Sequence, residues 1–590
     1  GALPGKGWVR VSRADAVAGN AEPHAASSET TGASDSATQG IPEILVQGAR
    51  TSNTDIRRTE SDVQPYVVFD AQEIQRSMAT DLETFLRTRL PMNQSRGSEN
   101  QNVTNPFGNH SSIDLRGLGA DQTLILVNGR RMPGLAVEST GTRQPDINGI
   151  PLSAVERIEI LPSTAGGIYG GGATGGVVNV ILKRDYNDLK VAARYDGTFD
   201  GGGAQRRLDA TAGFTLEEGR THVMLMGSYR DGQALNLGDR DFVERSRRQL
   251  QRNNPAAYAA VGQPDREPLH GYTTNIRSAS GADLVLRDMG AGERPLNSPI
   301  AHVPVGYAGP DSDGGAALLG AAGYNLALAD DVLGRSHSLL SAPVVSSLQM
   351  SARREFTDRV EVFLDASRFE NKAERGGNVA SAVTVVLPAG PDNPFTEAVK
   401  LSVPLVGYER NLLSEYVSLT EQLSGGVILR LPRQWTAQGE YTLGSSTYTY
   451  DRAPATLTPE GRAALVNGTL NPLSDVNVHR LDFSSFYPGG LRWFNEFPLE
   501  QKDVTLRLTG PLVSLPGGPL RLAALLERRE QLTGDRLSTQ AMTAGAPPRY
   551  IYFAEIGSVT SSAYAELNAP LISAANARPG LLGLDLRASY

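Results

Sequence analysis

Hydrophobic and polar residues alternate along most of the chain beyond residue 188. In the first segment Leu189, Val191 and Tyr195 are apolar, whereas Lys190 and Arg194 are charged. Side chains two residues apart lie on the same face of a β-strand, so this pattern predicts strands with one apolar and one polar face. Eleven strands are predicted in this way, at residues 189–200, 206–216, 221–231, 345–356, 360–371, 413–430, 435–450, 496–510, 519–531, 557–570 and 581–590.

The connections between these strands differ strongly in length. Short turns alternate with long connections, which is typical of barrels in an outer membrane. A soluble β-sandwich also has alternating strands, but it has no physical reason for such asymmetry. The short turns lie at 217–220, 356–359 and 431–434, and the long connections at 232–344, 372–412 and 451–495.

Residues 41–187 have a different pattern, typical of a compact α+β domain. Residues 66–70 form a strand-like run, and Asp70 with Glu73 has the spacing of a capping box that begins a helix. Thr80 and Glu83 repeat this spacing and predict a second helix.

Two further strands of this domain are predicted from apolar runs. Residues 123–127 form a buried strand, and Asn128-Gly129 directly after it is a strong signal for a hairpin turn. Residues 156–161 form another strand.

The stretch GIYGGGATGGVVNVILKRDY contains a literal G-x-G-x-x-G at Gly170, Gly172 and Gly175. In a dinucleotide-binding fold these glycines open a helix whose N-terminus faces the pyrophosphate. Here the following run, 177–182, is short and mostly β-branched, which favours a strand. We therefore expect the glycines to serve tight turns and close backbone packing, not phosphate binding.

Composition excludes several functions. The net charge of −8 gives no case for a nucleic-acid surface, and the absence of cysteine excludes disulfides and thiolate metal sites. No apolar run is long enough for a membrane helix. The seven histidines are far apart in the sequence, and neither H-E-x-x-H nor G-x-S-x-G occurs. We expect no enzymatic activity, no cofactor and no metal site.

Residues 1–40 are rich in alanine, glycine, serine and threonine, which predicts a flexible N-terminal segment. Within it, GWVRVSR (residues 7–13) has two interpretations that remain open. It is either the last strand of a domain that lies upstream or part of a disordered tail.

Three motifs carry a resemblance to a known family. They are LRGLGADQTLILVNGRR (115–131), DINGIPLSAVERIEILPS (146–163) and IYGGGATGGVVNVILKRDY (168–186). In order and spacing they resemble the plug of the TonB-dependent outer-membrane receptors. One departure is GIYGGGATGG, where relatives more often carry a serine and an acidic residue.

The resemblance implies a mainly β fold, with an α+β plug at 51–187 followed by antiparallel transmembrane β-barrel strands at 188–590 with long extracellular loops. The family has 22 barrel strands, whereas this sequence has about eleven. We therefore expect the sequence to be truncated, with the second half of the barrel missing. An incomplete N-terminus is left open. The apolar alternation at the end of the chain resembles a C-terminal barrel strand, but the odd strand number would place that end outside.

EILVQGAR (43–50) resembles the TonB box, which the family carries before the plug, here at 41–50. A short extended segment can add a strand to a sheet of TonB, and force is then passed through main-chain hydrogen bonds. Glu43, Ile44, Leu45 and Val46 are the residues that we expect to contact TonB.

The resemblance also implies roles for residues of the plug. Arg116 and Arg157 match plug arginines that pair with carboxylates of the barrel, although ordinary solvated charge is the alternative. A structural role in turns and packing is expected for Gly117, Asn128, Gly129, Gly170, Gly175, Gly176 and Asn179.

The implied function is TonB-dependent active transport of a scarce solute across the outer membrane of a Gram-negative cell, with the plug and N-terminus facing the periplasm. Ferric siderophores are the commonest solutes of the family, and saccharides and cobalamin are alternatives. The expected partners are TonB, outer-membrane lipid and lipopolysaccharide, and the small extracellular ligand. The basic cluster at 245–252 is compatible with an anionic ligand or with solvated surface. A transducer that signals to an inner-membrane regulator and a passive porin or adhesin-like barrel are the rival classes.

Overall fold

The fold is that of a computed structural model. The residues that it describes are 67–94, 110–136, 142–162, 172–183, 186–259, 261–263, 265–287, 292–375, 383–407, 413–452, 457–483, 485–486, 493–540, 549–573, 575–577, 579, 581 and 583–589.

A five-stranded mixed sheet forms the centre of the plug. Its order is β1-β6-β7-β2-β3, in which β2 and β7 run parallel and the other neighbours antiparallel. The run after the glycines is strand β7, so the structure confirms that no helix follows them and that the dinucleotide fingerprint is a coincidence. The strands are β1 Val67–Asp70, β2 Thr123–Val127, β3 Arg130–Arg131, β6 Val155–Leu161 and β7 Gly176–Leu182.

Two short helices pack against this sheet, α1 (Ala71–Arg76) and α2 (Leu82–Arg89). Ile74 of α1 and Phe85 of α2 are buried in one core with the apolar residues of β6 and β7. Asp70 caps α1 through the amide of Glu73, as predicted. The second predicted cap was wrong by one residue, because Asp81, not Thr80, accepts the N–H of Thr84.

The remaining elements of the plug are short. They are the 3₁₀ turns η2 Ala120–Gln122 and η3 Leu152–Ala154, and the strand pair β4 Leu135–Ala136 and β5 Thr142–Arg143.

An eleven-stranded antiparallel sheet, which we call the wall, follows the plug. The strand order is β28-β27-β24-β23-β22-β21-β18-β17-β10-β9-β8. Each of the eleven strands predicted from alternation is present, which confirms this part of the prediction. The strands are β8 Leu189–Asp196, β9 Gln205–Leu216, β10 Thr221–Gly232, β17 Ala342–Thr357, β18 Val360–Arg375, β21 Ser414–Leu431, β22 Trp435–Arg452, β23 Trp493–Leu515, β24 Gly518–Thr533, β27 Ile556–Ile572 and β28 Leu584–Ser589.

The two faces of the wall have opposite polarity. On β22, Glu440 and Thr442 are buried, whereas Tyr441 and Leu443 between them are 47% and 39% exposed. The buried face carries most of the polar side chains, together with aromatic residues such as Tyr448 and Tyr450, and contacts the plug, whereas the exposed face is apolar. This arrangement reverses that of a soluble sheet and is expected where the outer face meets lipid.

The long connections contain regular structure that the sequence did not predict. A four-stranded sheet of order β15-β12-β20-β19 joins two of them, and helix α6 lies in the third. The elements are β11 Leu235–Asn236, α4 Phe242–Asn253, α5 Pro255–Ala259, β12 Asn275–Ser278, β13 Val285–Leu286, β14 Arg294–Pro295, β15 Ile300–His302, η6 Pro310–Ser312, η7 Ala316–Gly320, β16 Ser338–Leu340, β19 Val383–Leu387, β20 Val399–Val403, α6 Pro459–Val466, β25 Arg536–Gln540 and β26 Arg549–Phe553.

Three connections pack into one body, which we call the loop unit and define as the described residues of 233–341, 383–407 and 457–486. All three contribute to a single buried core, for example through Ile276, Phe395 and Phe483. Hydrogen bonds join the segments as well, such as that from the amide of Gly306 to Asp475 (2.7 Å).

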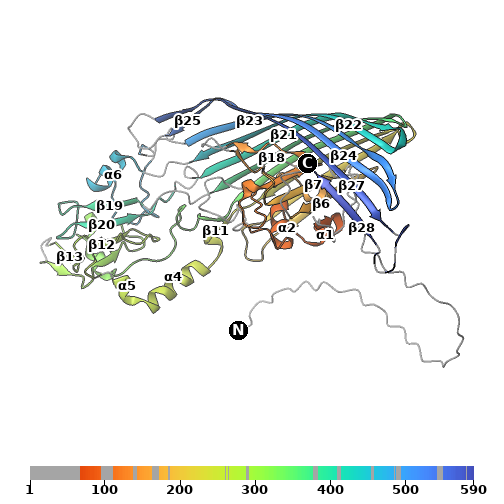
Figure 1. The fold of residues 1–590 in the computed structure, drawn as a ribbon. Coiled ribbons are helices and arrows are strands. Elements are labelled where there is room, and N and C mark those ends of the chain that lie inside the picture. The colour runs from red at the N-terminus through yellow and green to blue at the C-terminus, as the bar shows by residue number, and fades with distance from the viewer. Residues whose placement is uncertain are drawn as a thin grey trace, which may run out of the picture. The chain divides into compact units, whose positions relative to one another are not determined.

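The plug (orange) lies against one face of the wall, and the loop unit extends from one end of the wall strands (Figure 1). Among the described residues, no helix has the length and hydropathy needed to cross a membrane.

Candidate functional site: the plug–wall interface

Asn179 on the neighbouring strand β7 positions the hairpin turn of the plug. Asn128 and Gly129 both have positive φ (54° and 75°), as the predicted turn between β2 and β3 requires. The amide of Gly129 donates to Oδ1 of Asn179 on β7 (2.9 Å), and Asn179 donates to the buried Glu159 (3.0 Å). The turn therefore places Arg130, the next residue, in a fixed position at the wall.

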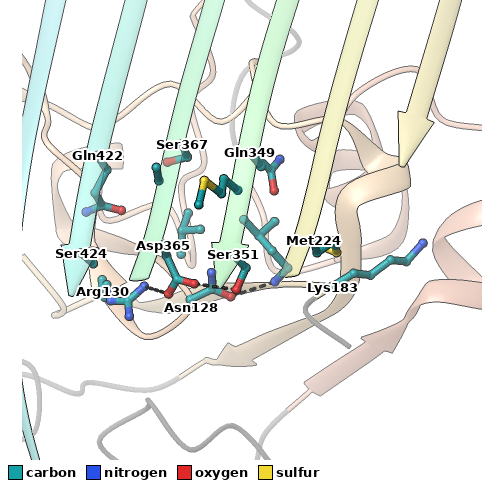
Figure 2. A pocket seen from close by; sticks show the side chains of 14 residues that line it. Asn128, Arg130, Lys183, Met224, Gln349, Ser351, Asp365, Ser367, Gln422 and Ser424 are labelled. Atoms are coloured by element: carbon teal, nitrogen blue, oxygen red, sulfur yellow. Dashed lines mark hydrogen bonds and ion pairs between the residues drawn. The ribbon is translucent and has the colours of Figure 1, made fainter. Parts of the chain in front are cut away.

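Arg130 forms the main ion pair between the plug and the wall. Its Nη1 lies 2.8 Å from Oδ2 of Asp365 on β18, and its Nε donates to Glu440 on β22. Its guanidinium also lies over the ring of Phe363, 5.4 Å from the centroid. Figure 2 shows Arg130 pointing to Asp365, which lies between Arg130 and Ser351.

The two carboxylates are held by further donors from the wall itself. Ser351 donates to Asp365 (2.7 Å), and Gln438 and Thr442 contact Glu440. Burial lowers the pKa of Arg130, but Glu440 and Asp365 more than offset this, so its pKa is raised. Arg130 is therefore a cation, and loss of one partner of such a buried ion pair costs about 3–5 kcal/mol.

Arg131 is in a different environment from Arg130. Burial and repulsion by Arg529 lower the pKa of Arg131 to about 10, so it is still a cation at neutral pH. Its carbonyl oxygen accepts hydrogen bonds from Gln422 (3.0 Å) and Gln501 (3.4 Å) of the wall.

A second contact is centred on Asp146. Its Oδ2 accepts from Asn371 (2.8 Å) and Ser418 (2.6 Å) of the wall. Its Oδ1 accepts the backbone amides of Ser111 and Asn148 in the plug (both 3.0 Å). Asp146 therefore joins plug backbone to wall side chains, and it lies in the family motif DINGIPLSAVERIEILPS without having been singled out.

Further polar contacts lie on both sides of these two centres. Ser446 donates to the carbonyl of Gly134 (2.5 Å). Arg230 of β10 donates to the carbonyl of Thr80 (2.9 Å) and lies 3.6 Å from Asp81, the cap of α2. Hydroxyl, amide and charged groups thus supply many of the contacts that hold the plug.

A small polar cavity lies beside the Arg130 ion pair. Its volume is ≈ 30 Å³, enough for about one or two water molecules. Nη2 of Arg130 and Nε2 of Gln349 are buried there without a hydrogen-bond partner in the described part of the chain. The residues that line it come from plug and wall: Val127, Asn128, Arg130, Leu182, Lys183, Met224, Gln349, Met350, Ser351, Asp365, Ala366, Ser367, Gln422 and Ser424.

The two plug arginines predicted to contact the wall have other environments. Arg157 pairs with Glu156 (2.7 Å) and Glu159 (2.8 Å), both on its own strand β6. Arg116 is exposed with φ 66°, and it has no ion pair among the described residues. The contacts of both arginines with carboxylates of the barrel stay predictions.

The predicted structural glycines occupy tight positions where they are described. A Cβ on Gly176 (φ 138°) would lie 2.5 Å from the carbonyl oxygen of Leu161, and one on Gly175 would lie 3.1 Å from two carbonyl oxygens. Gly117 has φ 70°. These positions fit the predicted role in turns and close packing. Gly170 and the TonB-box-like residues Glu43, Ile44, Leu45 and Val46 lie outside the described residues.

In the described part of the chain no group of three or more histidine or carboxylate side chains is arranged to hold a metal ion. The interface holds a small domain on one face of a sheet whose other face is apolar. Its contacts are ion pairs and hydrogen bonds together with apolar packing, such as that of Leu135 and Ala136 against aromatic side chains of the wall. Such an arrangement is that of a plug domain docked on a membrane-type β-sheet.

Comparison with known proteins shows what the plug region is similar to. Residues 58–177 match the model of the TonB-dependent Receptor Plug Domain. The ferric enterobactin receptor PirA of Pseudomonas aeruginosa is 32% identical over 186 residues, which cover 30% of this chain and 24% of the relative. The ferrienterobactin receptor of Escherichia coli K12 is 35% identical over 120 residues, 19% of this chain and 16% of the relative. Residues 58–177 of the chain are thus similar to the plug domain of TonB-dependent receptors.

The matched regions thus span about a quarter or less of the curated relatives. Among solved structures, a mutant of the ferric enterobactin receptor PfeA of Pseudomonas aeruginosa has a TM-score of 0.49 at 16% identity, covering 90% of this chain and 58% of that one.

Proposed function

We propose that this protein takes part in TonB-dependent uptake of a ferric siderophore across an outer membrane. The observation that carries the proposal is the plug, which matches the family model and is seated on the polar face of the wall through the Arg130 ion pair. The named relatives are receptors for ferric enterobactin.

The character of the interface supports a plug that is held at rest and can be displaced by force. Contacts such as those of Ser446 and Gln422 are neutral hydrogen bonds that water can replace, at a net cost of about 0.5–1.5 kcal/mol each. The pair of Arg130 with Asp365 and Glu440 is stronger and resists displacement until force is applied.

Force would enter through the segment before the plug. Residues 43–46 would add a strand to TonB, and the pull would be passed along the backbone to the plug. In this arrangement the plug and the N-terminal segment face the periplasm, the exposed apolar face of the wall contacts lipid, and the loop unit faces outward.

Uptake of ⁵⁵Fe-labelled ferric enterobactin tests the proposal in cells that lack other receptors for it and express the whole gene. Deletion of residues 43–50 should abolish uptake and leave binding to energy-depleted cells intact, because only coupling is lost. Deletion of residues 30–37, in the same N-terminal segment, is the matched control and should have no effect. Uptake that survives the deletion of 43–50 would support a passive pore. Cobalamin and maltodextrin, offered to the same cells, test the alternative solutes.

A further inference from the structure

The loop unit contains a cavity where its three segments meet. Its volume is ≈ 370 Å³, within the range of small-molecule sites. The lining combines proline and leucine side chains with a cation, two carboxylates and amides. The residues are Arg287, Pro310, Asp311, Gly314, Leu387, Pro391, Asp392, Asn393, Pro394, Leu465, Gly468, Asn471 and Pro472.

The frame of the cavity is fixed by buried hydrogen bonds. Asn393 is 1% exposed, donates to the carbonyls of Pro388 (3.0 Å) and Glu397 (2.8 Å), and accepts the amide of Phe395 (2.9 Å). The backbone amide of Arg287 donates to the carbonyl of Pro394 (2.8 Å). The cavity is therefore preformed, which reduces the entropy that a ligand must overcome on binding.

Opposite charges line this cavity without pairing with each other. Among the described residues, no ion pair joins Arg287 to Asp311 or Asp392. Nε of Arg287 is buried and has no hydrogen-bond partner within the described chain, and the guanidinium makes only a 3.3 Å contact to the carbonyl of Phe395. A buried donor without a partner is unfavourable unless something else accepts from it.

The negative side of the cavity is reinforced by a helix end. Helix α6 ends at Val466, and a Cβ placed on Gly468 just beyond it would lie 3.3 Å from Oδ1 of Asp392. A helix C-terminus carries partial negative charge, so a carboxylate beside it is favourable only when a cation is also present. This end of the cavity therefore favours an ammonium group.

We propose that the cavity binds a small zwitterion that carries both an ammonium and a carboxylate group, an amino acid or a short peptide. The ammonium would lie between Asp392 and Asp311, and the carboxylate would accept from Arg287. A simple anion is repelled by the two aspartates and a simple cation by the arginine, whereas a neutral ligand leaves all three charges unpaired. The proline and leucine side chains give the rest of the ligand an apolar surface. The site does not depend on which solute the receptor transports.

Titration of the full chain in detergent micelles tests this site, with glycylglycine and triglycine as probes and calorimetry or saturation-transfer NMR as the readout. N-acetylglycylglycine lacks the ammonium group, and glycylglycine amide lacks the carboxylate. We expect saturable binding of at least one zwitterionic probe, and binding at least about tenfold weaker for each blocked probe, because each has lost one charge-assisted interaction.

Variants then assign each charge to its partner. Asp392→Asn should weaken the binding of glycylglycine about tenfold and leave the residual affinity for N-acetylglycylglycine unchanged. Arg287→Gln should leave the affinity for glycylglycine amide unchanged. Both aspartates are exposed, so their substitution does not threaten folding. Asp283→Asn, exposed on the same loop unit and away from the cavity, is the matched control. The proposal is overturned if neither zwitterion binds, if a blocked probe binds equally well, or if Asp283→Asn acts like Asp392→Asn.

Discussion

The contact between the plug and the wall differs in kind from the contact among the three segments of the loop unit. The plug meets the wall through buried charges and hydrogen bonds, centred on Arg130 and Asp146, and through a smaller apolar cluster around Leu135. The three segments of the loop unit meet in a continuous apolar core. Apolar burial is lost all at once when a core opens, whereas single hydrogen bonds can be exchanged with water one by one. We therefore expect the plug–wall contact to depend more on single polar groups than the core of the loop unit does.

The largest effect is expected from Arg130→Met, which breaks the polar side of this comparison. It leaves Asp365 and Glu440 buried without their cation, at a cost of about 3–5 kcal/mol. The plug should become sensitive to protease at temperatures where the wild type is protected, while the loop unit is unaffected. Arg76→Met, on the exposed face of α1, is the control. The triple variant Arg130→Met, Asp365→Asn, Glu440→Gln should recover much of the loss, and a wild-type-like Arg130→Met would contradict the assigned role.

Phe395→Ala disrupts the apolar core of the loop unit. Phe395 is fully buried in the core of the loop unit, and large-to-small substitution of such a residue costs about 3–5 kcal/mol. Protease should then cut within the loop unit, and the plug should keep its protection. Val305→Ala is the control, because Val305 is 70% exposed on the same unit. Loss of plug protection in Phe395→Ala would show that the two regions are not independent.

Asp70→Ala tests a local contact that belongs to neither interface. The Asp70 carboxylate caps α1 through the amide of Glu73 (2.7 Å), and loss of such a cap costs about 1 kcal/mol. A small drop in the midpoint of thermal unfolding of the plug is expected. Asp70→Asn retains a side-chain oxygen acceptor and should be nearly neutral. A drop as large as that of Arg130→Met would mean that local capping, not the wall, stabilises the plug.

Glu159→Gln tests how the stability of the plug depends on pH. Burial raises the pKa of Glu159, and Arg157 and Asn179 offset this only in part. The folded plug therefore holds this proton more tightly than the unfolded chain, so its contribution favours folding at acid pH and is lost as pH rises through the raised pKa. Thermal unfolding should depend less on pH in Glu159→Gln than in the wild type between pH 4 and neutrality. An unchanged pH dependence would show that Glu159 is not the responsible group.

The parts that the sequence predicted well are those with local causes. Strands such as β22 follow from the alternation of Glu440, Tyr441, Thr442 and Leu443, and the hairpin turn follows from Asn128-Gly129, because each depends on neighbouring residues alone.

The features that could not be predicted from the sequence depend on contacts between residues far apart along the chain. Arg130 lies 235 residues from Asp365 and 310 from Glu440, and nothing local marks it above Arg116 or Arg157. The strands of the loop unit are only two to five residues long, too short for a periodic pattern, and the pair β12–β20 joins two different connections.

The composition of the loop unit also sets the order in which the molecule can assemble. Strand β12 precedes β17 in the chain, β20 follows β18, and the two pair in one sheet. Helix α6, which closes the same core, comes only after β21 and β22. Closure of this core therefore joins segments that the wall strands β17, β18, β21 and β22 separate along the chain, so it is a non-local step of folding.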